Sequence, residues 1–148
     1  MPDALDVSVA LRGGVTSRSF AWDFVRRFAD EWTGRPLRSG DGCTAAELDA
    51  AQADLGFELP AALREGYALC GRRDDLTRQE EPLVTPAELY VDDGFGGVLA
   101  FRRENQDCAA WGIPLDQIEQ DDPQWWWSRT RGGSPSSTAY PWPGWSWY

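Results

Sequence analysis

The fold is decided by residues 44–71, which read TAAELDAAQADLGFELPAALREGYALCG. Thr44 and Glu47 form the T-x-x-E pattern of a capping box, in which each side chain accepts the other residue's backbone amide. We therefore expect a helix to begin directly after Thr44. Gly56 is suited to the left-handed conformation that ends a helix, and Pro60 suits the first position of a second helix that runs to Gly71. The segment predicts two short helices around one turn.

A β-hairpin is predicted further along the chain. GVLAF at 97–101 has the apolar, β-branched and aromatic character of a strand, RRENQ at 102–106 reads as a polar turn, and AAWGI at 109–113 reads as the returning strand. Shorter strands are expected at 83–84, 89–91 and 125–127. Helices first and strands afterwards favour an α+β fold, with helices packed against a single, mostly antiparallel sheet.

The N-terminal region is less clearly patterned. Residues 5–11 alternate apolar and polar side chains, which fits either an edge strand or an ordered arm. A helix capped by Ser17 or Ser19 is then expected to run to Gly34. Its aromatic side chains recur at every fourth position, which predicts that they face the core; they are Phe20, Phe24, Phe28 and Trp32.

Composition excludes several classes of protein. The chain has 148 residues and no apolar run of the roughly 20 residues needed to cross a bilayer. Its N-terminus lacks the basic and apolar regions of a secretory signal, so we expect a cytoplasmic protein that does not bind membranes. It contains no His and no Lys, which removes Ser-His and Cys-His pairs, Schiff-base lysines and P-loop lysines. We expect no enzymatic activity.

The three cysteines, Cys43, Cys70 and Cys108, are odd in number and have no histidine beside them. Neither a disulfide framework nor a metal site is indicated, and no cofactor is expected. Residues 1–131 are predicted to form one domain. Residues 132–148 form a Trp-, Pro- and Ser-rich tail, in which three prolines between Pro135 and Pro143 forbid a regular helix.

The charge is unevenly distributed. The net charge is −10, and residues 41–131 hold 19 acidic side chains against 8 arginines. Such a domain repels nucleic acid and anionic membranes, and it attracts basic proteins at a rate that salt suppresses. The expected partner is therefore a basic protein.

Several motifs together resemble the SUKH superfamily, the SMI/KNR-like group that includes a fungal cell-wall regulator and many bacterial immunity proteins. They are E-x(7)-LGF-x-LP-x-x-L-x-x-x-Y-x-L-x-G from Glu47, GVLAFRRENQ from Gly97, WGI at 111–113 and DDP at 121–123. The resemblance covers about residues 41–127, and it implies helices packed against one sheet. It also implies either toxin neutralisation or a scaffolding role in the cell. Family members usually carry a further helix after the DP segment, and the proline-rich tail departs from that pattern.

Candidate partner-binding residues are polar side chains in predicted loops. The strongest are Asp92 with Asp93 and Asp121 with Asp122, because each pair is expected to flank a strand that holds it in place. The other candidates are Glu119, Asp74, Asp75 and the turn residues Glu104, Asn105 and Gln106. In an immunity protein they would occlude a nuclease- or deaminase-like toxin by pairing with its arginines and lysines. A different reading is a carbohydrate-binding module that stacks sugars on Trp142, Trp145 and Trp147.

Overall fold

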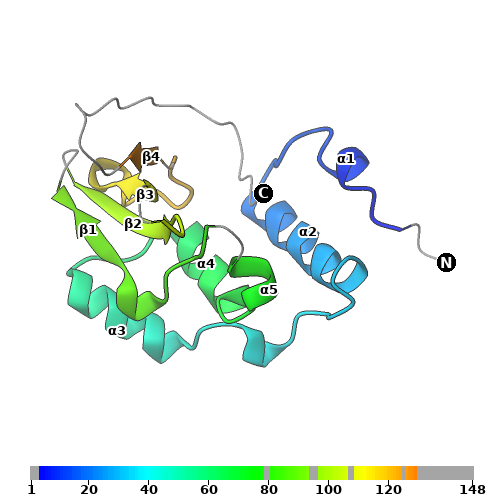
Figure 1. Cartoon of the computed structure of the whole chain (residues 1–148), viewed down its shortest axis with the longest axis horizontal. Helices are drawn as coiled ribbons and strands as arrows, with labels where there is room; N and C mark the ends of the chain where they lie inside the picture. Colours follow the sequence, from blue (N-terminus) through cyan, green and yellow to red (C-terminus); the bar gives the residue numbers. More distant parts are fainter. Residues whose placement is uncertain (1–3, 79–80, 94–96, 107–108, 125, 130–148) are drawn as a thin grey trace.

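A computed structural model describes residues 4–78, 81–93, 97–106, 109–124 and 126–129. Within these residues, helices come first and strands afterwards, which confirms the predicted α+β class (Figure 1). The α-helices are α1 (Val7–Ala10), α2 (Arg18–Glu31), α3 (Ala45–Leu55), α4 (Ala61–Cys70) and α5 (Asp74–Thr77). The strands are β1 (Tyr90–Asp92), β2 (Val98–Arg103), β3 (Ala109–Pro114) and β4 (Trp126–Arg129), and short 3₁₀ segments are η1 (Ser39–Asp41), η2 (Pro86–Glu88) and η4 (Leu115–Gln117).

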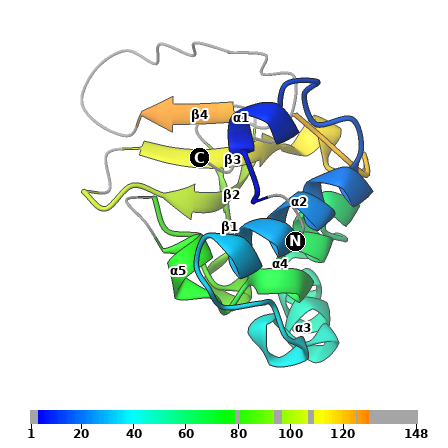
Figure 2. The same ribbon diagram turned by 90° about the vertical axis from the view of Figure 1, so that its right-hand side faces the viewer.

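The strands form one sheet in the order β1-β2-β3-β4, and each neighbouring pair is antiparallel, as predicted (Figure 2). The register places Asp92 opposite Val98 and Val98 opposite Pro114. The end of β1, the start of β2 and the end of β3 therefore meet at the same end of the sheet. The connection from β3 to β4 begins at that end, whereas the turn from β2 to β3 lies at the opposite end.

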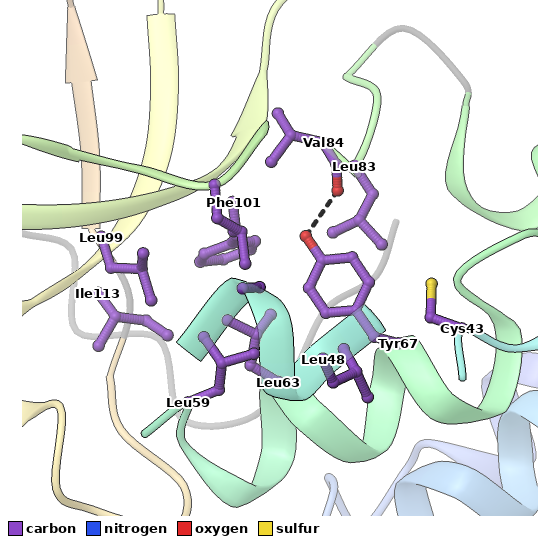
Figure 3. Packing of buried hydrophobic residues seen from close by; sticks show 12 residues of the cluster. Cys43, Leu48, Leu59, Leu63, Tyr67, Leu83, Val84, Leu99, Phe101 and Ile113 are labelled. Atoms are coloured by element: carbon purple, nitrogen blue, oxygen red, sulfur yellow. Dashed lines mark hydrogen bonds between the residues drawn. The ribbon is translucent and has the colours of Figure 1, made fainter. Parts of the chain in front are cut away.

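Helices α3 and α4 supply one side of the core and the sheet supplies the other (Figure 3). Tyr67 lies between them, and its hydroxyl donates a hydrogen bond of 2.6 Å to the carbonyl of Val84. The buried members of this core are Cys43, Leu48, Ala51, Leu59, Leu63, Tyr67, Leu83, Val84, Leu89, Leu99, Phe101 and Ile113. Burial of these side chains provides most of the driving force for joining the two layers.

The local signals in residues 44–71 act as predicted. The amide of Glu47 donates to Thr44 Oγ1 at 3.2 Å, and the amide of Thr44 donates to Glu47 Oε2 at 2.7 Å, which completes the capping box. Gly56 ends α3 with φ at 83°, in the left-handed region. Pro60 differs by one position from the prediction, because it precedes the first residue of α4 as the N-cap.

Helix α2 is capped by Ser17 as expected, but only part of its aromatic stripe faces inward, since Phe24 is buried, Phe20 and Phe28 are half-buried and Trp32 is exposed. Trp22, which lies outside that stripe, is only 7% exposed, whereas Trp32 at the helix C-terminus is 61% exposed. The reason is that α4 lies between α2 and the sheet (Figures 1 and 2). Glu65 of α4 accepts the indole N–H of Trp22 at 2.7 Å and Nε of Arg18 at 3.1 Å, which fixes the face that α2 buries.

The N-terminal arm is not an edge strand. Residues Val7–Ala10 form the short helix α1, because the side chain of Asp6 accepts the amide of Val9 at 3.1 Å and caps it. Leu5 is buried, its amide donates to Glu31 Oε2, and its carbonyl accepts the indole N–H of Trp32 at 3.2 Å. The arm therefore packs on α2.

The predicted hairpin is present, but its polar turn begins later than expected. Arg102 and Arg103 continue β2, and the amide of Glu104 donates to the carbonyl of Ala109 at 2.9 Å to close the hairpin. The register shifts between Ala100 and Arg102, as at a β-bulge or a similar irregularity. The sequence showed only the polar run, whereas pairing of Arg102 with Trp111 and of Arg103 with Ala110 extends the strand through its first two residues.

Candidate protein-binding surface

The first predicted pair of carboxylates lies at the C-terminal end of β1. Asp92 is the last residue of the strand and is half-buried, and Asp93 follows it in an exposed position. Because Asp92 is opposite Val98 in β2, the strand pairing holds this end of β1 in place. Asp93 therefore flanks a strand as expected, whereas Asp92 lies within the strand and not in a loop.

The second pair lies in the connection between η4 and β4. Asp121 and Asp122 are both exposed, and the backbone carbonyl of Asp121 accepts the amide of Ala62 at 2.8 Å. This bond fastens the connection to the first turn of α4. A second bond, from the amide of Gln124 to Gln117 Oε1 at 3.2 Å, closes the loop on itself. The loop is thus held at two points.

The connection that carries the second pair begins at the end of the sheet where β1 finishes, and the amide of Leu115 donates to the carbonyl of Gly97 at 3.0 Å there. Farther along the connection, the bond from Ala62 places Asp121 beside α4. We use the name acidic end of the sheet for the carboxylates of these two segments: Asp92, Asp93, Glu119, Asp121 and Asp122.

The remaining candidates lie elsewhere. Glu104, Asn105 and Gln106 belong to the β2–β3 turn at the opposite end of the sheet, where Asn105 and Gln106 are exposed and Glu104 is half-buried. Asp74 and Asp75 begin α5. The sheet therefore separates the candidate residues into distinct regions.

Asp75 is largely neutralised inside the molecule. Its Oδ1 lies 2.7 Å from Nε of Arg73 and its Oδ2 accepts Nη2 of Arg73 at 2.8 Å. Arg73 is only 3% exposed, and it also contacts Asp41 at 3.2 Å and Thr33 Oγ1 at 3.2 Å. The hydrogen bond from Arg73 lowers the pKa of Asp75. Asp75 is therefore a structural residue that ties α5 to the loop around Thr33 and Asp41.

The arginines of the described chain are mostly committed to such contacts. Eight of them lie between 2.7 and 3.9 Å from a carboxylate: Arg18, Arg26, Arg27, Arg35, Arg64, Arg72, Arg73 and Arg78. At the acidic end, Asp121 is 3.8 Å from Arg18. Asp93 and Glu119 form no ion pair with any residue that the structure describes.

A groove adjoins the acidic end and was not predicted. It has a volume of about 780 Å³, and it lies between the α3–α4 region and the loop at 118–121. Its lining mixes apolar and acidic side chains: Asp49, Gln52, Phe57, Glu58, Leu59, Pro60, Ala61, Arg64, Ile118, Glu119, Gln120 and Asp121. The sequence pointed to Glu119 and Asp121, but it gave no signal that Phe57 and Glu58 face them.

Two predictions fall outside the described residues. They are the Trp-rich tail at 132–148, with Trp142, Trp145 and Trp147, and the third cysteine, Cys108. Cys43 and Cys70 are buried, and burial raises the pKa of Cys70 to about 11. Across the described ranges, no three His, Cys, Asp or Glu side chains are grouped so as to hold a metal ion.

Comparison with known proteins finds no match: no family model, curated protein or solved structure matches the chain. In the part of the chain that the structure describes, none of the helices has both the length and the apolar character to cross a bilayer.

Proposed function

We propose that this chain is a non-catalytic, cytoplasmic protein-binding domain of the SUKH type, which neutralises a basic toxin domain by covering its active site. The toxin would be nuclease- or deaminase-like, since such enzymes carry a basic surface for a nucleic-acid substrate. Carboxylates placed where that surface expects phosphates would speed encounter and then block substrate.

One observation supports the proposal: the β3–β4 connection, which carries Glu119, Asp121 and Asp122, begins at the end of the sheet where β1 finishes, and most arginines of the described chain are already in ion pairs. Asp92 is the last residue of β1 and Asp93 follows it. A surface that carries charge mainly of one sign is what electrostatic steering requires. The motif resemblance to immunity proteins agrees with this reading.

The direct experiment is co-expression with the toxin domains encoded next to this gene, scored by rescue of growth. Rescue by the native chain is expected. No rescue and no binding by any such domain would refute the toxin-neutralising role, and an isolated gene with a different basic partner would favour the scaffolding role instead.

The role of the acidic end is then tested by association kinetics of the purified pair at several salt concentrations. Replacing Asp92 and Asp93 together by Asn should slow association roughly threefold or more at low salt and flatten its salt dependence. The matched control replaces Asp30 and Asp54 by Asn, which removes the same two charges from exposed positions on α2 and α3. Equal effects of the two double variants would show that only net charge matters.

A further inference from the structure

The groove beside the acidic end has a volume of about 780 Å³. Its two walls come from segments about sixty residues apart, one bearing Phe57 and Glu58 and the other Ile118 and Glu119. Each wall therefore offers both apolar surface and carboxylate groups.

The carboxylates of Glu58 and Glu119 are available to a partner. Both residues are exposed, and neither forms an ion pair with a side chain in the described ranges. The groove's own arginine, Arg64, has its Nη2 2.8 Å from Oδ1 of Asp49, whereas its buried Nη1 has no hydrogen-bond partner in the described structure. The four carboxylates of the lining outnumber this one arginine, so the lining carries a net negative charge.

The apolar part of the lining restricts which side chains of a partner can fit the groove. Phe57 and Ile118 are half-buried and pack against the core, so they present fixed apolar surface to the groove. A lysine or arginine stem covers such surface with its methylene groups while its head stays near charge. Arginine fits better than lysine, since its planar guanidinium stacks on an aromatic ring and bonds a carboxylate through two N–H groups.

We propose that the groove is the anchoring pocket of the binding surface, and that it receives an arginine side chain from an extended segment of the partner protein. This inference rests on the proposed function and adds to it a location and a chemistry. Arginine is one of the residues that most often contribute the largest share of binding energy at the centre of a protein interface. One such anchor would fix the position of the partner after the charges have brought the two proteins together.

The test uses the full chain, labelled with nitrogen-15, and two capped tripeptides: acetyl-Ala-Arg-Ala-amide and the same peptide with citrulline, which is nearly the same shape and uncharged. We expect the arginine peptide to shift the amide signals of Phe57, Glu58, Ile118 and Glu119 in a saturable way. Its affinity should exceed that of the citrulline peptide about fivefold, the fold-change that one favourable exposed ion pair supplies.

The double variant E58Q/E119Q should reduce binding of the arginine peptide to the citrulline level. The control D30N/D54N removes the same charge from residues that do not line the groove, and it should leave binding unchanged. Both variants must first give the native melting temperature and amide spectrum. Should the double variant fail that check, the single variant E119Q, on the exposed loop, replaces it and should weaken binding in the same direction.

The proposal is overturned if both peptides bind equally, if the shifts spread over exposed carboxylates such as Asp30 and Asp54, or if Ca²⁺ reproduces the same shifts. These outcomes are separate from the fate of the proposed function. If a toxin still binds through Asp92 and Asp93 while the groove ignores arginine, the groove is wrong and the function stands. If the groove selects arginine and no basic protein is neutralised, the arginine pocket stands and the proposed function is wrong.

Discussion

Replacing Tyr67 by Phe removes one oxygen atom from the junction between the helices and the sheet. Tyr67 is 1% exposed, and its hydroxyl donates to the carbonyl of Val84 at 2.6 Å (Figure 3). Burial raises the pKa of Tyr67, so the hydroxyl stays protonated and remains a donor over the range of ordinary assays. The ring itself is retained in the variant, and the surrounding packing changes little.

The magnitude follows from what the variant leaves behind. A buried carbonyl that loses its donor costs about 1–3 kcal/mol. Because the ring still fills the site, no large cavity adds to this cost. We expect the free energy of unfolding to fall by about 2 kcal/mol and the melting temperature by roughly 4–8 °C, given the scale of about 2–4 °C per kcal/mol for domains near this size.

The assay is urea unfolding followed by tryptophan fluorescence, together with a calorimetric melting curve. The matched control is Tyr90→Phe, which also removes one hydroxyl but keeps a half-buried ring with Arg103 5.5 Å from its centroid. That variant should stay within about 0.5 kcal/mol of the native chain. If the two variants are equally stable, the bond between Tyr67 and Val84 does not hold the two layers together as described.

Two further predictions concern charged side chains. The amide of Thr44, and next to it Arg72, lower the pKa of Glu47 from 4.5 to about 2, so its contribution is present above pH 4.5 and is lost as the pH falls towards 2. Glu47→Gln should therefore lose less stability than the native chain over that interval, measured by urea unfolding at a series of pH values. Arg73→Met should cost about 3 kcal/mol, because it removes the two short hydrogen bonds to the carboxylate of Asp75, 28% exposed, and the contact with Asp41.

Each of these has a clear contrary outcome. Parallel pH profiles for the native chain and the Glu47 variant would mean that the capping box is not formed in solution. For the buried arginine, the control is Arg72→Met, whose side chain is 48% exposed and whose loss should cost no more than about 1 kcal/mol. Equal losses in the two arginine variants would contradict the buried network.

The sequence predicted the elements whose signals are local. A capping box and a helix-ending glycine each depend on only a few neighbouring residues, and Thr44, Glu47 and Gly56 act as expected. The orientation of α2 was not predictable in this way, because it depends on Glu65, a residue more than forty positions from Trp22. Tertiary packing decided which face was buried.

In the candidate surface, too, features with local sequence signals could be predicted and features that depend on tertiary packing could not. That Asp92 and Asp121 lie in exposed or terminal positions could be predicted from turn signals. That the connection carrying Asp121 begins at the end of the sheet where Asp92 lies follows from the register. Asp75 is unavailable to a partner because it pairs with Arg73, and this pairing depends on a loop that buries the arginine. The groove depends on contact between two segments that are distant in sequence. Neither feature can be predicted from one short stretch of sequence.

The order β1-β2-β3-β4 follows the chain, so every strand pairs with its neighbour in sequence. Among the described strands there is no crossover, and the β3–β4 connection joins two adjacent strands. Leu115 and Ile118 of this connection pack against the core, whereas Glu119 and Asp122 are exposed. Substitutions at the exposed positions would therefore change the charge of this surface without rethreading the sheet or altering the packing around Tyr67.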